Sequence, residues 1–166
     1  MTPATESTRD RVVALRRRFR VPRAFLFKAW TDATYFARWF GPKPWTLEKC
    51  QVDARPGGAW NAWLKRPDGT IVHVGGVYSE VERDTRLVFS WEVKSQSEAA
   101  RSLSVVTIEF GEEADGVEIC LTHRELTTAQ AVDMDAGWNS TFDSLEDFIS
   151  AESVSSPGSL SQENKR

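Results

Sequence analysis

Cysteine, histidine and tyrosine are scarce in this chain of 166 residues, which has two of each. Two cysteines, Cys50 and Cys120, are too few for the disulfide framework of a small secreted domain. Together with His73 and His123 they also lack the spacing of a structural zinc site, because each falls in a different predicted strand. We therefore expect two free thiols, no metal ion and no cofactor.

Long apolar runs are missing as well. No stretch approaches the roughly 20 apolar residues that a membrane-spanning helix requires. Residues 1–9 are polar and do not resemble the apolar centre of a signal peptide. Since the cysteines need no oxidising compartment, these absences predict a cytoplasmic protein without a membrane partner.

Sequence signatures of phosphate binding and nucleophilic catalysis are also absent. The pair Gly57–Gly58 falls in a predicted turn, and Gly75–Gly76 lies within a predicted strand, where it favours a bulge or a sharp bend. Neither pair belongs to a phosphate-binding loop. No local Ser-His-Asp or Cys-His pattern is present, although residues distant in sequence can still meet in space to form one.

Basic residues do not dominate the chain, whose net charge is −3 and whose pI is near 5.5. Such a balance disfavours binding to polyanions. The one basic cluster lies around the first predicted strand and consists of Arg16, Arg17, Arg18, Arg20 and Arg23. Because successive side chains of a strand point to opposite faces, these arginines cannot form one contiguous patch. The pattern favours a solvated, salt-bridged sheet edge over a nucleic-acid site.

Tryptophan and phenylalanine, by contrast, are abundant, with seven and nine residues. Together with 40% hydrophobic and 27% charged residues, they indicate a soluble globular protein with either an aromatic-lined groove or a plain aromatic core. The length suits one domain, which we place at residues 10–150. Residues 1–9 and the Ser-rich segment 151–166 are predicted to be disordered.

The order of predicted elements indicates an α+β fold. Residues 11–20 alternate as a strand, and two short helices follow at 23–30 and 32–40, the second capped by Thr31–Asp32. From Trp45 onward apolar residues recur at every second position, which predicts a run of strands and a curved antiparallel sheet of six or seven.

A long helix is predicted at the end of the domain, over residues 128–150. Thr127 and Gln130 have the spacing of a capping box. An apolar stripe at helical spacing follows, formed by Met134, Trp138, Phe142, Leu145 and Ile149. We expect this stripe to lie across the concave face of the sheet. Because its stripe is strongly aromatic, this helix should not pack flush against a curved sheet and should leave a gap.

Five segments, in order, resemble the activator-of-heat-shock-protein-90-ATPase-like proteins of the START-like, or SRPBCC, superfamily. They are FLFKAWTDATYFARWFGP, VDARPGGAWNAWLKRPDGT, GGVYSEVERDTRLVFSWE, VTIEFGEEADGVEICLTHREL and GWNSTFDSLEDFI. The similarity runs from about Arg11 to Ser150. It implies a helix-grip fold, in which the sheet wraps the long helix around a deep, largely apolar cavity. Ala33 stands where proline is common in the family, which bears only on local rigidity.

The residues expected to line this cavity are mostly aromatic. The apolar candidates are Trp60, Leu64, Phe89, Trp91, Phe110, Trp138 and Phe142, and the polar candidates are Arg17 and His123. His123 is in phase with the inward residues of its strand, so it either contacts a ligand or is a core histidine satisfied by backbone groups or Glu125. If Arg17 points inward, it must be paired or bind a ligand carboxylate, because an unpaired buried charge is costly; otherwise it extends to solvent at the sheet edge. His73 is assigned to the surface.

These features favour a protein that binds a small hydrophobic or aromatic molecule. Two alternatives remain open on the sequence: a cochaperone-like interaction module related to the stress response, with a chaperone or a second copy as partner, and an enzyme of the cyclase or hydratase kind. The relatives implied by the resemblance include carriers, cyclases and cochaperone domains, so fold alone does not choose among them. An interaction module should expose large apolar residues, and only Trp45 and Trp63 are predicted to face outward.

Overall fold

The computed structural model describes residues 9–94 and 103–155, and it contains one sheet and three helices within those ranges. The ends predicted to be disordered lie largely outside the described residues. In chain order the elements are β1 (Arg11–Phe19), α2 (Arg23–Thr31), α3 (Ala33–Phe36), β2 (Thr46–Val52), β3 (Ala59–Lys65), β4 (Ile71–Glu82), β5 (Arg86–Val93), β6 (Ser104–Glu113), β7 (Gly116–Leu126) and α4 (Thr128–Ser155).

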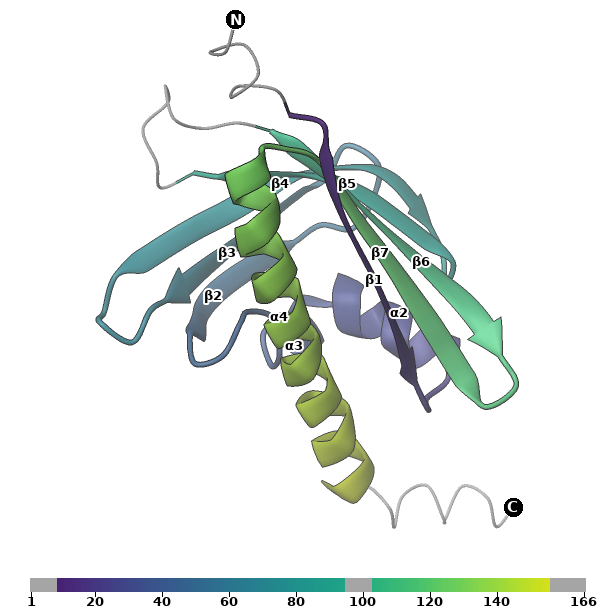
Figure 1. Cartoon of the computed structure of the whole chain (residues 1–166). Helices are drawn as coiled ribbons and strands as arrows, with labels where there is room; N and C mark the ends of the chain where they lie inside the picture. The colour runs from purple at the N-terminus through teal and green to yellow at the C-terminus, as the bar shows by residue number, and fades with distance from the viewer. Residues whose placement is uncertain (1–8, 95–102, 156–166) are drawn as a thin grey trace, which may run out of the picture.

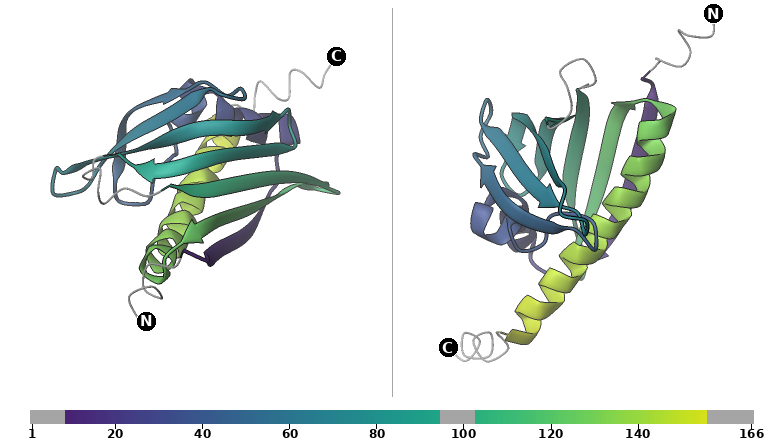
Figure 2. Two further views of the ribbon diagram at one scale, coloured as in Figure 1. Left: turned by 90° about the horizontal axis from the view of Figure 1, so that it is seen from above. Right: turned by 90° about the vertical axis from the view of Figure 1, so that its left-hand side faces the viewer.

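The seven strands form one antiparallel sheet in the order β1-β7-β6-β5-β4-β3-β2. Strands β2 to β7 each pair with the next along the chain, whereas β1 crosses over to pair with β7 at the opposite edge. The sheet curves around α4, with α2 and α3 near its lower end (Figure 1, Figure 2). This arrangement confirms the predicted helix-grip architecture.

Local sequence accounts for most element ends. Asp32 caps α3 by accepting a hydrogen bond from the Thr34 backbone N–H at 2.9 Å. At the start of α4, Thr127 and Gln130 exchange two hydrogen bonds, of 2.9 and 3.1 Å, so the capping box is confirmed. Two lengths differ from prediction: α3 ends at Phe36 and continues only as turns, and α4 runs to Ser155.

The prediction of a bulge at Gly75–Gly76 is wrong, because the strand is regular there. These glycines pair in continuous register with Asn61 and Trp60 of β3, and the register of β4 shifts only between Tyr78 and Glu80. Glycine is needed for a different reason, since a Cβ at position 76 would lie 1.9 Å from a backbone oxygen of β5. The glycines allow close strand approach rather than an irregular one.

Helix α4 does not lie centrally over the sheet. It packs chiefly against β1, with further contacts to β7, so its aromatic stripe closes the core on that side. There Phe142 is fully buried between the rings of Phe19, Trp30 and Trp138. The opposite half of the concave face, formed by β3, β4 and β5, is therefore left partly uncovered by the helix.

No helix in the described part of the chain is long and apolar enough to cross a membrane. Both cysteines are free thiols, as predicted. Burial raises the pKa of each thiol, which lowers its thiolate fraction at neutral pH.

Candidate binding cleft

A cleft of about 590 Å³ lies where α4 diverges from the sheet. Its floor comes from the inward side chains Leu64 of β3, Val72 and Val74 of β4, and Trp91 and Val93 of β5. One side is α4, through Met134, Gly137, Trp138 and Thr141. Ligand sites in proteins commonly have volumes of about 300–1,000 Å³ and mostly apolar linings, so the cleft has the size and character of such a site.

The other side of the cleft is a short segment between α3 and β2, residues 41–45, which we call the strap. Phe40 precedes it, and Gly41, Pro42, Lys43 and Trp45 line the cleft. The sequence predicted a helix ending at residue 40, where Gly41–Pro42 would terminate it, and a strand beginning at Trp45, with no role for the residues between. The strap was therefore missed as part of the site, and no periodic signal in so short a segment marks it.

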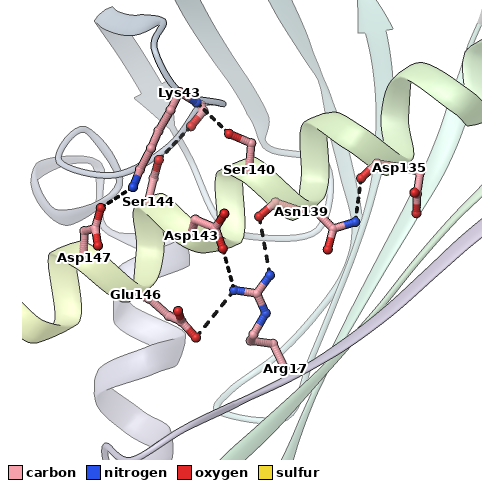
Figure 3. A network of polar contacts seen from close by, with 10 residues as sticks. Arg17, Lys43, Asp135, Asn139, Ser140, Asp143, Ser144, Glu146 and Asp147 are labelled. Carbon is pink, nitrogen blue, oxygen red and sulfur yellow. Dashed lines mark hydrogen bonds and ion pairs between the residues drawn. The ribbon is translucent and has the colours of Figure 1, made fainter.

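Polar contacts hold the strap against α4 (Figure 3). The Lys43 backbone N–H donates to Ser140 Oγ at 2.8 Å, and Ser144 Oγ donates to the Gly41 carbonyl at 3.2 Å. The Lys43 ammonium also pairs with the Asp147 carboxylate, which raises the pKa of Lys43. The strap is thus fastened to one face of the helix.

Three of the nine predicted site residues line this cleft: Leu64, Trp91 and Trp138. Trp60 and Phe89 lie behind the floor, where their rings contact each other at 5.4 Å and the Trp60 indole donates to the Ser90 carbonyl. The last two apolar candidates, Phe110 and Phe142, belong to the packed core and lie outside the cleft lining. Phe110 meets Phe27 at 5.4 Å, and Phe142 has no exposed surface.

His123 is fully buried behind the cleft. Its Nδ1 accepts the indole N–H of Trp138 at 3.0 Å, and its Nε2 lies 2.7 Å from Ser104 Oγ. Since an indole N–H can only donate, Nδ1 carries no proton and the ring is the Nε2–H tautomer. Nε2 then donates to Ser104, whose hydroxyl donates to the Trp91 carbonyl at 3.4 Å.

This environment makes His123 a structural histidine. Burial lowers its pKa from 6.5 to about 4, so the imidazole is neutral at physiological pH. Both ring nitrogens are engaged within the core. The inward phase of His123 was predicted correctly, and its partners are Ser104 and Trp138 rather than backbone groups or Glu125.

Arg17 extends from β1 to α4 and not into the cleft (Figure 3). Its guanidinium donates to Asp143 at 3.0 Å and lies 3.5 Å from a Glu146 oxygen. The same group lies 5.5 Å from the centre of the Phe142 ring. Arg17 thus connects the edge strand to the helix as a paired arginine, one of the outcomes considered for an inward position, and it does not line the cleft.

The two tryptophans predicted to face outward have different environments. Trp63 stacks on His73 at 4.3 Å on the outer face of the sheet, with the Lys49 ammonium 4.5 Å from its ring. His73 lies on that face as predicted, half-buried, and its Nε2 lies 2.8 Å from Asn61 Oδ1. Burial and the nearby Lys94 and Lys49 lower the pKa of His73. Trp45, in contrast, lines the cleft.

The ionisable residues lining the cleft are Lys43, Arg66 and Asp133. Within residues 9–94 and 103–155, no group of three or more histidines, cysteines or acidic residues is placed to hold a metal ion. The cleft is therefore a largely apolar space with a few charged residues in its lining.

Comparisons with known proteins agree with this architecture. A protein from Nitrosomonas europaea has 25% sequence identity and a TM-score of 0.73, with 86% of this chain and 96% of that chain covered. The AHSA1 protein from Silicibacter pomeroyi has 23% identity and a TM-score of 0.76, with 86% and 99% covered. A protein from Chromobacterium violaceum has 19% identity and a TM-score of 0.76, with 83% and 96% covered. At these identities, the likeness shows the fold.

A search of curated proteins finds no match. The family model described as Activator of Hsp90 ATPase homolog 1-like protein, in contrast, matches residues 20–150. This span contains every element from α2 to β7, all the cleft residues and most of α4. The chain therefore belongs to the Activator of Hsp90 ATPase homolog 1-like family.

Proposed function

We propose that this protein binds a small apolar or aromatic molecule in the cleft between α4, the strap and the β3–β5 half of the sheet. The observation that carries the proposal is the cleft itself, about 590 Å³ in volume with a floor of aliphatic and indole side chains. Leu64, Trp91 and Trp138 contact the ligand directly. The other aromatic residues of the predicted set support these three from the core.

Burial of apolar surface supplies a large part of the free energy that ligand binding requires. A ligand that buries on the order of 200–300 Å² gains roughly 5–7 kcal/mol at about 25 cal/mol per Å². The loss of translational and rotational freedom offsets part of this gain. A dissociation constant near the micromolar range needs about 8 kcal/mol, which a few polar contacts added to the apolar term can provide.

The two alternative functions have less support from the site. An enzyme of the cyclase kind needs an acid–base group in contact with substrate, whereas His123 is buried, neutral and bonded at both nitrogens. An interaction module needs exposed large apolar residues in one patch. Trp63 stacks on His73 and Trp45 lines the cleft, so neither tryptophan provides one. The exposed large apolar residues of the described chain are aliphatic, namely Val12, Ile71, Val77, Leu103 and Val132. Both tryptophans predicted to face outward are thus engaged within the chain.

Gly137 offers a direct test, because it lines the cleft and a Cβ there has no heavy atom within 4 Å beyond its own neighbours and nearby helix backbone. Leucine at this position would occupy ligand space without a clash. It would also favour the helix, in which glycine costs about 1 kcal/mol relative to alanine. Gly137→Leu should therefore weaken binding of a neutral aromatic probe, N-phenyl-1-naphthylamine, by at least about tenfold while keeping or raising thermal stability.

Binding is measured by titrating the probe and following its emission together with tryptophan quenching. The matched control is Ala129→Leu, which adds a leucine to an exposed site of the same helix outside the cleft. The control should bind the probe like the wild type, near one-to-one. Absence of saturable binding to the wild-type protein would refute the proposal and make the interaction-module function the better account.

A further inference from the structure

We infer that the ligand of this cleft is an anion, with a flat apolar body and a carboxylate, sulfonate or similar acidic group held by Arg66. The inference rests on the proposed function and specifies the chemistry of the ligand. The lining contains three ionisable residues, Lys43, Arg66 and Asp133, and they differ in whether a nearby opposite charge neutralises them.

Lys43 does not supply a free positive charge to the cleft. Its ammonium is paired with Asp147 of α4, a residue that does not line the cleft (Figure 3). The Asp147 carboxylate neutralises this charge locally, and both groups are well exposed, so solvent screens what remains. An anion in the cleft would have to compete with Asp147 for Lys43.

Arg66, on the hairpin between β3 and β4, has no such partner. Among the described residues, no carboxylate lies within ion-pair distance of its guanidinium. Asp68 on the same hairpin forms no ion pair with it: the pKa of this carboxyl is lowered chiefly by the hydrogen bond from the Thr70 backbone N–H, at 2.9 Å, and to a lesser degree by the Arg66 charge. The positive charge of Arg66 is therefore left for another acceptor.

Trp45 holds the Arg66 guanidinium at the cleft. The guanidinium carbon lies 5.1 Å from the centre of the Trp45 ring, and both residues line the cleft. A guanidinium over an aromatic ring is stabilised by the ring electrons and still presents its N–H groups at the edge. Those donors form a planar fork that matches the two oxygens of a carboxylate or the oxygens of a sulfonate.

Asp133 and Trp91 specify the ligand further. Asp133, on α4, is the one carboxylate among the described lining residues, so it should repel an acidic group and direct it toward Arg66. The Trp91 indole N–H is buried and has no acceptor among the described residues. Because an unpaired buried donor is costly, the floor favours a ligand that carries an oxygen acceptor over a pure hydrocarbon.

Two probes with the same aromatic frame test the inference. The anion 1-anilinonaphthalene-8-sulfonate and the neutral N-phenyl-1-naphthylamine differ by the sulfonate, so the difference between their dissociation constants reports the charge. Arg66→Gln should raise the dissociation constant of the anion by about tenfold or more, the usual effect of losing a charge-assisted hydrogen bond. The dissociation constant of the neutral probe should change by less than about twofold. Asp133→Asn, which removes a repelling carboxylate, should lower the dissociation constant of the anion and leave that of the neutral probe unchanged.

The matched control is Lys65→Gln, which removes the same charge from the adjacent, exposed residue that lies outside the lining. It should leave both dissociation constants within about twofold of wild type, because Lys65, exposed like Arg66, does not line the cleft and salt screens its charge at that distance. Equal weakening of both probes by Arg66→Gln, or an equal effect of Lys65→Gln on the anion, would overturn the inference while leaving the proposed function intact. If the wild type binds neither probe, the proposed function fails and this inference falls with it.

Discussion

At the scale of single residues, His123 is an example of why the alternation of side chains along a strand does not by itself identify a binding site. Alternation along β7 places its side chain inward, and that prediction is confirmed, with the residue fully buried. Its partners come from elsewhere: Ser104 from β6 and Trp138 from α4. Sequence periodicity gives the face of a strand but not the depth of a side chain in the core, so a cleft residue and a core residue look alike.

The buried, neutral imidazole makes stability depend on pH. Burial lowers the pKa of His123 from 6.5 to about 4, so as the pH falls the unfolded chain takes up this proton before the folded protein does. The stabilisation is complete above about pH 6.5 and is lost progressively down to about pH 4, by on the order of 3 kcal/mol. Urea unfolding at a series of pH values measures this slope.

The histidine contribution is isolated by comparison with His123→Gln, which lacks the titrating ring. The variant should be less stable at pH 7, because the Trp138 indole and Ser104 lose their partner. The gap to wild type should narrow as the pH falls from about 6.5 to about 4. A gap that stays constant over that range would contradict the pH dependence assigned to His123.

At the scale of elements, the strand count, the two short helices and the long C-terminal helix could be predicted because period and capping residues are local properties. The capping box of Thr127 and Gln130 is an example that the structure confirms. Local sequence could not tell why glycine stands at positions 75 and 76, because a bulge and a close approach of neighbouring strands both favour a residue without a side chain. The strap was missed for a related reason: its role depends on α4, which lies about a hundred residues along the chain.

Helix α4 is fastened on two sides, by the strap and by Arg17 (Figure 3). If Arg17 serves as this fastening, Arg17→Met should lower the free energy of unfolding by about 1 kcal/mol, the upper range for partly exposed ion pairs. The effect should shrink at high salt. Binding of N-phenyl-1-naphthylamine should stay within about twofold of wild type, because the guanidinium does not reach the cleft.

Asp143→Asn is the matched partner variant, since it removes the carboxylate that accepts from Arg17 at 3.0 Å. The two stability changes should not add in the double variant, because both remove the same interaction. A loss of probe affinity in Arg17→Met without a loss of stability would instead assign Arg17 to ligand binding.

At the scale of the whole molecule, the position of the cleft follows from the off-centre path of α4. The helix packs against β1 and β7, where the core is filled by Phe142 and its neighbours, and leaves the β3–β5 half to be closed by the strap. An amphipathic stripe predicts that a helix covers a sheet but not which strands it crosses. The sequence therefore predicted a cavity and seven aromatic or aliphatic residues lining it, of which Leu64, Trp91 and Trp138 line the cleft.

The most direct test of the account is a site-resolved binding measurement with the seven tryptophans as reporters. The indole N–H resonances of ¹⁵N-labelled protein, assigned by single Trp→Phe substitutions, would be followed while N-phenyl-1-naphthylamine is added. The account predicts large, saturable shifts for Trp45, Trp91 and Trp138, which line the cleft, and little change for Trp63, which stacks on His73 on the outer face of the sheet. Shifts confined to Trp63, or none at saturating probe, would contradict it.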